Sequence, residues 1–320
     1  MRLIKSVEEA LLYSQETVMA LGNFDGVHKG HQTLIKHCIR EGKKGIGVPS
    51  VLILDPHPSL VFNKSNFKLI NTTEQKIKLM EQLGIENIFL LPFDDKLANV
   101  TAEEFGLHYL KGIFKTKKVI VGFNYSFGRK GLGTPGLLKD LGAAMGFAVE
   151  IVQPVMCEGE IVSSTLIREK LQKGDIRGAQ KLLGYWPVLG GRVIPGEQRG
   201  RVLGFPTANI NVPDYILLPA LGVYAALANH KNTLIPAIVN IGNKPTFRSS
   251  KISIEAHLLD YEQNLYDEYL EISLLKHIRP EQKFDQISQL QHQVACDIKA
   301  ARLLFQEFKN DFAHISLSPK

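Results

Sequence analysis

Two patterns of hydrophobic and polar positions divide the chain. In the first half, short apolar runs alternate with segments whose apolar residues recur at helical spacing. The apolar runs predict buried strands at Val18–Leu21, Val51–Leu54, Ile88–Leu91, Val119–Val121 and Val149–Val152. The helical patterns lie near residues 30–41, 73–83, 101–112 and 136–145. This alternation predicts βαβ units, and hence a parallel sheet in a Rossmann-like α/β domain.

The pattern changes after Gly184-Tyr185-Trp186-Pro187. The segments that follow are short, rich in β-branched residues and separated by glycine and proline: Val188–Ile194, Thr207–Val212, Val223–Leu227, Leu234–Ile241, Ile252–Leu258 and Tyr269–Leu275. Such a series predicts a small antiparallel barrel or sandwich. A helical pattern over roughly Glu281–Lys309 closes the chain, with a bend expected at Ala295-Cys296-Asp297. A chain of 320 residues exceeds the usual size of one domain, so we expect two, at 1–184 and 185–320.

The densest candidate chemistry follows the first of these strands. The stretch reads Leu21-Gly22-Asn23-Phe24-Asp25-Gly26-Val27-His28-Lys29-Gly30-His31. A strand, a glycine-rich turn and a helix together aim backbone N–H groups at a phosphate. His28 and His31 would lie beside that anion, and Gly30 would let it approach the backbone closely. The stretch therefore predicts a phosphate site.

Two other interpretations of this turn exist. Glycine-rich turns after strands are common and often have no function. Two histidines three residues apart also suggest zinc, but no third and fourth ligand lies at suitable spacing nearby. Phosphate chemistry is the better supported of the three.

Three more segments of the first half belong with this turn. Ligands of parallel sheets bind at the carboxyl ends of the strands, and both Leu54-Asp55-Pro56-His57-Pro58 and Gly122 to Gly131, with Asn124, follow such ends. Taken alone, each of these two is explained equally well as a plain loop. Ser163-Ser164-Thr165 precedes a helix that carries Arg168 in its first turn and runs to about Gln172. A single hydroxyl would be explained as a helix cap, whereas three hydroxyls followed by an arginine also form an anion clamp. A short helix then restarts at Gly174-Asp175, and Gly184 ends it.

The second half has its own candidate site. Thr207 and Asn209 lie two residues apart, so they face the same side of an extended segment. A hydroxyl and an amide oxygen are hard ligands that Mg²⁺ accepts beside nucleotide phosphates. A turn after Pro206 would explain the same residues without a metal. Glu255 alternates with apolar residues in a strand pattern, which usually means a solvent-facing carboxylate, but it becomes a candidate general base if it lies near Thr207.

Composition and charge narrow the class of protein. Hydrophobic residues make up 44% and charged residues 22%, as in an ordinary globular protein. The net charge of +6 is not gathered into runs, so nucleic-acid binding is unsupported. Three scattered cysteines indicate a reducing compartment, the N-terminus turns acidic where a signal peptide would be apolar, and no apolar run approaches a membrane span. We expect a cytoplasmic protein that binds neither membrane nor nucleic acid, as a monomer or weak homo-oligomer.

Taken together, the motifs resemble those of the bacterial bifunctional riboflavin kinase/FMN adenylyltransferase family, also called FAD synthetase. The resemblance runs in order over nearly the whole chain: Gly22 to His31, Asp55-Pro56-His57-Pro58, Gly122 to Gly131, Ser163 to Arg168, Gly204 to Asn209, Gly222-Val223-Tyr224, Asn240 to Phe247 and Glu255 to Asp260. The chain departs from it at Asp267, where glycine is usual, and at Asn124-Tyr125, where Asp-Phe is frequent. The family's fold is a nucleotidyltransferase α/β domain followed by a six-stranded β-barrel with a C-terminal helix.

The resemblance implies two reactions in series and assigns residues to each. In the second half, riboflavin kinase would use ATP to convert riboflavin to FMN, with Glu255 accepting the hydroxyl proton and Thr207 and Asn209 holding Mg²⁺. Residues implied to bind ATP or flavin there are Gly191, Arg192, Gly196, Gly204, Pro206, Thr207 and Asn209. In the first half, FMN would attack a second ATP to give FAD and pyrophosphate, with His28 and His31 stabilising the developing charge. Residues implied to bind ATP or phosphate there are Gly22, Phe24, Asp25, Gly30, Asn124, Ser163, Ser164, Thr165 and Arg168.

Two alternatives remain beside the bifunctional enzyme. One half could have lost its activity and act as a binding or regulatory module. A nucleic-acid-binding protein is the other, suggested by a pI near 9.0 and by the likeness of the histidine turn to other nucleotidyl-transferring enzymes. It would show tight, steeply salt-dependent binding to RNA or DNA.

Overall fold

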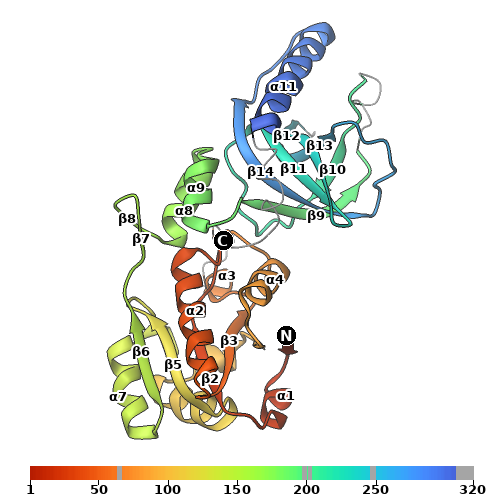
Figure 1. Cartoon of the computed structure of the whole chain (residues 1–320). Helices are drawn as coiled ribbons and strands as arrows, with labels where there is room; N and C mark the ends of the chain where they lie inside the picture. Colours follow the sequence, from red (N-terminus) through yellow and green to blue (C-terminus); the bar gives the residue numbers. More distant parts are fainter. Residues whose placement is uncertain (63–66, 197–199, 201–203, 246–249, 308–320) are drawn as a thin grey trace. The chain divides into compact units, whose positions relative to one another are not determined.

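The computed structural model describes the whole chain except residues 63–66, 197–199, 201–203, 246–249 and 308–320 (Figure 1). Contacts between residues group the chain into two compact units, one from Met1 to Ser164 and one that begins at Thr165. Within the described residues, helices long and apolar enough to span a membrane are absent.

The first unit is built on a six-stranded sheet in which every neighbouring pair of strands is parallel. The strand order is β1-β4-β3-β2-β5-β6. The strands are β1 (Arg2–Ile4), β2 (Thr17–Leu21), β3 (Val48–Asp55), β4 (Asn87–Pro92), β5 (Thr116–Gly122) and β6 (Ala148–Val152). The chain leaves β2 toward β3 on one side and later returns to β5 on the other, so the strand order reverses at β2. The carboxyl end of β2, where the histidine turn begins, is therefore the expected ligand site of this sheet.

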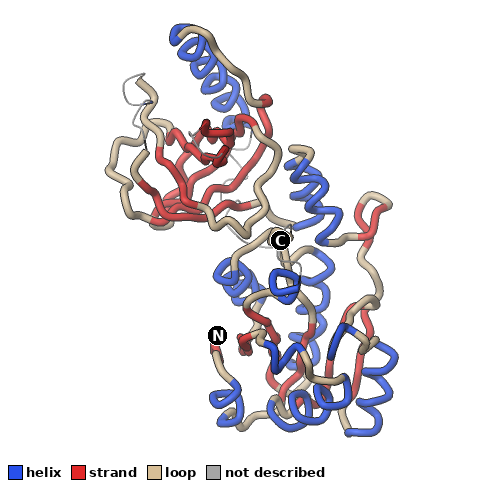
Figure 2. The backbone as a smooth tube through the Cα atoms, turned by 180° about the vertical axis from the view of Figure 1, so that it is seen from behind, coloured by secondary structure: helices blue, strands red, loops and turns tan. Residues whose placement is uncertain are grey.

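Helices cover both faces of the sheet. One face is covered by α2, which lies in front of β2 and β3 in Figure 1, and the other by η1 and α7, seen from behind in Figure 2. Alternate residues of β2 point to opposite faces of the sheet, and all five are buried, which explains its continuous apolar run. The helices are α1 (Val7–Leu12), α2 (Lys29–Lys43), α3 (Pro58–Phe62), α4 (Thr73–Leu83), α5 (Asp95–Ala98), α6 (Ala102–Glu104), the π-helix η1 (Phe105–Ile113), the 3₁₀ turn η2 (Arg129–Gly131) and α7 (Pro135–Met145). A short hairpin, β7 (Met156–Cys157) and β8 (Glu160–Ile161), follows β6.

The second unit is a closed barrel with helices attached. Six antiparallel strands close in the order β10-β13-β12-β11-β14-β9. They are β9 (Val188–Ile194), β10 (Ala208–Asn211), β11 (Gly222–His230), β12 (Thr233–Pro245), β13 (Ser250–Leu258) and β14 (Tyr269–Pro280). Two helices precede the barrel, α8 (Ser164–Gln172) and α9 (Ile176–Leu183), and α11 (Ile287–Glu307) follows it. Because the barrel is closed, none of its six strands is an unpaired edge strand.

The predicted fold class is confirmed, as are the strands and helices of both patterns. Several details differ: the short elements α1, α3, α5, η2, β7 and β8 were not predicted, and three further differences follow. The helix expected over 101–112 begins as α6 and continues as the π-helix η1. The edge strand β1 was not predicted, because three residues carry too short a pattern. The last helix begins at Ile287, after β14 has ended at Pro280, and it is continuous through 295–297; the predicted end at 308–309 lies outside the described residues.

The first unit ends before the predicted domain boundary at 184/185. The helices α8 and α9 belong by contact with the barrel: the backbone N–H of Ala220 donates to the carbonyl of Leu171 at 3.0 Å, and Gly174 packs against His277. The predicted boundary at 184/185 separates the two proposed activities, and it stays a prediction. The two compact units are defined only by which residues pack together.

Candidate active sites

The turn between β2 and α2 places its two histidines at the N-terminus of α2. His28 is the N-cap, and its Nδ1 accepts a hydrogen bond from the backbone N–H of His31 at 3.3 Å. An imidazole nitrogen that accepts carries no proton, so neutral His28 has its proton on Nε2. The cap therefore sets which nitrogen of His28 can donate to a ligand.

The two imidazoles are packed against one another and against the turn. The rings of His28 and His31 stack at 3.7 Å between centroids, and His31 also packs on Phe24 at 5.2 Å. A Cβ on Gly30 would lie 3.1 Å from two atoms of the His28 ring, so the ring would have to move by a few tenths of an ångström. Gly30 therefore favours the observed placement of His28.

The backbone of the turn is held in an unusual conformation. Phe24, Gly26 and Val27 have φ angles of 50°, 84° and 33°, in the left-handed region. For Phe24 and Val27 this is strained, and such strain persists where surrounding structure holds it. Both side chains are fully buried. The carboxylate of Asp25, also buried, accepts hydrogen bonds from the backbone N–H groups of Ile70 and Asn71 at 2.9 and 3.4 Å.

The surroundings of the histidines are positive. His31 lies near His28, Lys76 and His57, and the last two are only 1% and 4% exposed. Burial, and then the neighbouring positive groups, hold the pKa of His31 well below its usual value of 6.5. Its Nδ1 is buried and has no hydrogen-bond partner among the described residues. Lys76 was not predicted to lie at this site, because a lysine in an amphipathic helix is normally solvent-exposed.

The structure locates some of the other residues that were predicted for this site. The Ser164 hydroxyl, at the end of the first unit, donates to the carbonyl of Asp25 at 2.8 Å, which places Ser164 against the histidine turn. Asn124 is exposed after β5, the strand next to β2. Thr165 and Arg168 fall in the second unit, and their contribution stays a prediction. So do the roles of Gly22 and Ser163.

The second unit contains a cavity of about 510 Å³ that is lined by strands of the barrel and by α11. Its polar lining includes the three chemistry-bearing residues that were predicted, Thr207, Asn209 and Glu255. Asn240, Asn243, Arg279 and Glu281 also line it. Its apolar lining is made by Phe205, Val223, Ile238, Phe284, Leu290 and Val294. One cavity therefore offers oxygen ligands together with an apolar wall.

The register of the barrel brings the predicted residues together. Glu255 of β13 is paired with Asn209 of β10 on one side and with Asn240 of β12 on the other. Directly opposed residues on neighbouring strands point to the same face. The Ser253 hydroxyl also donates to Oε1 of Glu255 at 3.3 Å. Glu255 is thus the centre of a polar row that lines the cavity, and it is only partly exposed.

The helix α11 forms part of the cavity wall, and a buried ion pair attaches it. Arg279 of β14 donates to both carboxylate oxygens of Asp297, at distances from 2.8 to 3.1 Å. The Asp297 side chain is 4% exposed and that of Arg279 17%. Gln293 also donates to Asp297, at 3.0 Å. The pair holds Leu290 and Val294 against the barrel, although no sequence pattern indicated it.

Of the remaining residues predicted for this half, some contact residues that line the cavity and others lie outside its lining. A Cβ on Gly196 would overlap the Asn209 amide, so the glycine is required for that approach. The carbonyl of Pro206 forms a hydrogen bond with Nδ1 of His257 at 2.8 Å. Arg192 is exposed and donates to the carbonyl of Asp267 at 2.9 Å, outside the lining described above. Asp267 itself has φ 64°, the left-handed conformation that explains why glycine is usual there. The roles of Gly191, Arg192 and Gly204 stay predictions.

Comparisons with known proteins match the two halves of the chain separately. The sequence model of the FAD synthetase family matches residues 12–166, and that of riboflavin kinase matches residues 183–305. The bifunctional riboflavin kinase/FMN adenylyltransferase of Listeria monocytogenes is 36% identical over 299 residues, covering 92% of this chain and 94% of its own length. The enzyme of that name from Escherichia coli is 33% identical over 310 residues, covering 95% and 98%.

A solved structure has the same overall fold. It is a Streptococcus pneumoniae protein described as a macrolide-efflux protein, with a TM-score of 0.85 and 30% identity over 94% of this chain and 99% of that one. Both domain matches, their order and the near-complete coverage of the relatives lead to one conclusion. The chain belongs to the bifunctional riboflavin kinase/FMN adenylyltransferase family.

Proposed function

We propose that this chain phosphorylates riboflavin with ATP to give FMN and then adenylylates FMN with a second ATP to give FAD and pyrophosphate. One observation carries the proposal: each matched segment holds its own polar site, the histidine turn at the strand-order reversal and the polar row in the barrel cavity. Two built sites in one chain favour two activities over a single activity with a binding module.

In the barrel, Glu255 acts as the general base. The 5′-hydroxyl of riboflavin attacks the γ-phosphorus of ATP, its proton passes to the Glu255 carboxylate, and ADP leaves. The apolar wall of Phe284, Leu290 and Val294 suits a flavin ring, whereas the polar row suits the phosphates. Phosphoryl transfer depends mainly on positioning and on neutralising charge, which this division of the cavity provides.

Thr207 and Asn209 are the proposed Mg²⁺ ligands of the barrel. Their oxygens line the same cavity as Glu255, and hydroxyl, amide and carboxylate oxygens are the donors that Mg²⁺ prefers. When bound, the ion supplies neutralisation of the ATP phosphates. Groups of three or more His, Cys, Asp or Glu that could hold a metal are absent from the residues that the structure describes. Two neutral oxygen donors, Thr207 and Asn209, suit an ion that the substrate's phosphates also hold.

In the first unit, the reaction needs charge stabilisation and no general base. The attacking atom is a phosphate oxygen of FMN, which is already ionised near neutral pH. It attacks the α-phosphorus of ATP, and the bond to pyrophosphate breaks. The Nε2–H of His28 and the N-terminus of α2 stabilise the charge that develops. We propose that Asp25 orders the turn, because its carboxylate is occupied by Ile70 and Asn71.

The test is to incubate the purified chain with riboflavin, ATP and Mg²⁺ and to separate the flavins by chromatography. FMN should appear first and FAD should follow. FAD alone should appear when FMN replaces riboflavin. A folded chain that forms only one of the products would contradict the bifunctional proposal. A cytoplasmic location and a monomeric or weakly associated state are also proposed.

A further inference from the structure

A histidine of the barrel cavity contacts the segment that carries a proposed magnesium ligand. His257 of β13 lines the cavity together with Glu255 and Thr207. Its Nδ1 lies 2.8 Å from the carbonyl oxygen of Pro206, the residue just before Thr207. A carbonyl oxygen can only accept a hydrogen bond, so Nδ1 carries a proton and donates it. This holds for the neutral and for the charged imidazole alike.

The strand register explains why this hydrogen bond is needed. Two residue pairs join β10 to β13, Ala208 with Ala256 and Asn209 with Glu255. One further step of that register would set Thr207 opposite His257, but β10 begins only at Ala208. The backbone that carries Thr207 therefore lies beyond the ladder of hydrogen bonds that fixes Asn209, and Pro206 has no N–H to add to it. The side chain of His257 ties this segment to β13 where the ladder does not reach.

The ring of His257 is itself held in place. It meets Phe205 edge to face, with 5.8 Å between the ring centroids and 85° between the ring planes. The backbone N–H of Phe205 donates to the carbonyl of Gly200 at 2.8 Å. The imidazole thus contacts both residues that precede Thr207, one through packing and the other through a hydrogen bond.

We propose that His257 is a positioning residue for the magnesium site of the barrel. Its Nδ1–H holds the Pro206 carbonyl and so sets the backbone from which Thr207 presents its hydroxyl to the ion and to the ATP phosphates. The proposal rests on the proposed riboflavin kinase activity and on the assignment of Thr207 as a ligand of the ion.

The chemistry of the ion favours this role over direct ligation. Mg²⁺ demands near-octahedral geometry and prefers oxygen donors, so an imidazole nitrogen is a poor ligand for it. The same strict geometry makes the affinity sensitive to the placement of Thr207. Groups that hold a ligand without touching the metal commonly change metal affinity when they are altered. A donor fixed on β13, next to Glu255, also keeps the proposed base and the proposed ligand in one frame.

The test uses the different places of the amide nitrogens in two variants. His257→Asn keeps an N–H donor at the place of Nδ1, since both nitrogens lie two bonds beyond Cβ, whereas His257→Gln moves the donor outward to the place of Nε2. In His257→Gln, kcat/KM for the magnesium–ATP complex in FMN formation should fall about fivefold, as expected when one hydrogen bond of ordinary net strength is lost. His257→Asn should retain at least about half of the normal value. KM for riboflavin, and FAD formation from FMN, should change in neither. His292→Gln, at an exposed histidine of α11, is the matched control and should behave as the unaltered chain does.

A second measurement does not depend on turnover. Hydrogen exchange of the full chain, followed by mass spectrometry, reports on the backbone of residues 205–210 directly. In the unaltered chain, Mg²⁺ with ADP should protect this segment more than ADP alone does. His257→Gln should exchange faster there without ligand and should lose the added protection, whereas His257→Asn should keep both properties.

The outcomes separate this proposal from the assignment of the ion. Normal exchange at residues 205–210, or a normal kcat/KM for the magnesium–ATP complex, in His257→Gln would overturn it. Equal losses in His257→Asn and His257→Gln would also overturn it, because the ring or its Nε2 would then be responsible. Thr207→Ala that forms FMN normally and keeps the Mg²⁺-dependent protection would instead refute Thr207 as a ligand, whatever the His257 variants show.

Discussion

Glu255 offers the sharpest test of the barrel site, through Glu255→Gln. The amide keeps an oxygen for the Ser253 hydroxyl and the same shape between Asn209 and Asn240. Because Glu255 is half-buried and keeps its neighbours, the free energy of unfolding should change by less than about 0.5 kcal/mol. The amide cannot take a proton from riboflavin. A general base contributes about 10²- to 10⁴-fold, so kcat for FMN formation should fall by at least about 100-fold, which is about 2.7 kcal/mol of barrier.

The assay follows both reactions in one preparation. Riboflavin with ATP reports the barrel, and FMN with ATP reports the first unit, with flavins separated by chromatography. FAD formation from FMN should be unchanged, and KM for riboflavin should stay within about threefold, since the lost interaction acts in the transition state. Glu262→Gln, in an exposed loop, is the matched control. A Glu255→Gln enzyme that makes FMN at more than about a tenth of the normal rate would refute the assignment of Glu255 as base.

Three further predictions concern other parts of the chain. Replacing His28 and His31 with Ala should abolish FAD formation and leave FMN formation intact in the same chromatographic assay; loss of both in a folded chain would contradict two separate sites. Asp297→Asn should cost about 3 kcal/mol in denaturant unfolding, because the Arg279 guanidinium loses its anion, and it should raise KM for riboflavin; an unchanged KM would show that α11 does not shape the site. Hydrogen bonds from two lysines lower the pKa of Glu41 to about 2, from an ordinary value of 4.5. Because this pKa is lower in the folded chain than in the unfolded chain, the stabilisation by Glu41 is fully present above pH 4.5 and is lost as the pH falls through about 2. Glu41→Gln should therefore weaken the pH dependence of thermal unfolding, followed by circular dichroism, across that window, and an unchanged dependence would rule this out.

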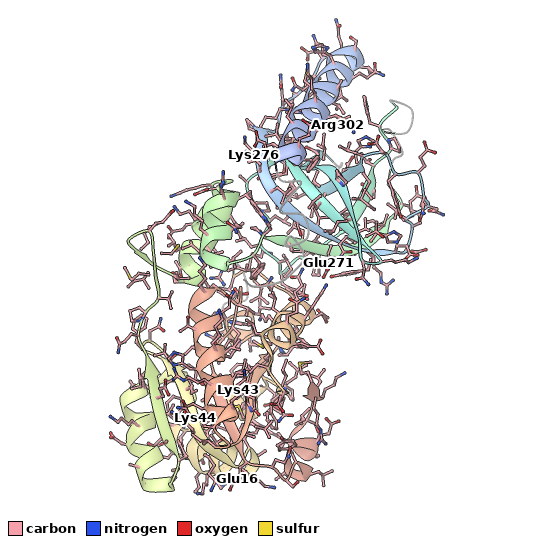
Figure 3. All side chains as sticks on the ribbon, viewed as in Figure 1. Glu16, Lys43, Lys44, Glu271, Lys276 and Arg302 are labelled. Atoms are coloured by element: carbon pink, nitrogen blue, oxygen red, sulfur yellow. The ribbon has the colours of Figure 1, made fainter. Side chains whose placement is uncertain are left out.

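The ion pairs of Glu41 lie away from the proposed chemistry. Glu41 accepts from Lys44 at 2.7 Å and from Lys118 at 2.9 Å. Lys44 and its neighbour Lys43, labelled in Figure 3, are at the end of α2 opposite the histidines. An effect of Glu41→Gln on stability without an effect on FAD formation would fit this separation.

Most of the fold could be predicted from local patterns. Parallel strands buried on both faces give continuous apolar runs, and barrel strands give short β-branched segments, so both domains were recognisable. Helix ends were also local: Gly184 does end α9, in the left-handed conformation. The π-helical part of residues 105–113 was not predictable, because its apolar spacing resembles that of an α-helix over so short a segment.

The features of the two sites also divide into those that local sequence predicts and those that it does not. The sequence by itself determined which turn carries the histidines, that Gly30 lies between them, and that Thr207 and Asn209 share a face, since each depends on residues close together in the chain. Only the tertiary structure decided that Lys76 is buried beside His31, that Glu255 lies between Asn209 and Asn240, and that Arg279 holds α11 through Asp297. The physical reason is that burial and strand register depend on contacts between distant segments. A lysine, a glutamate or an arginine has the same local pattern whether it faces water or a buried partner.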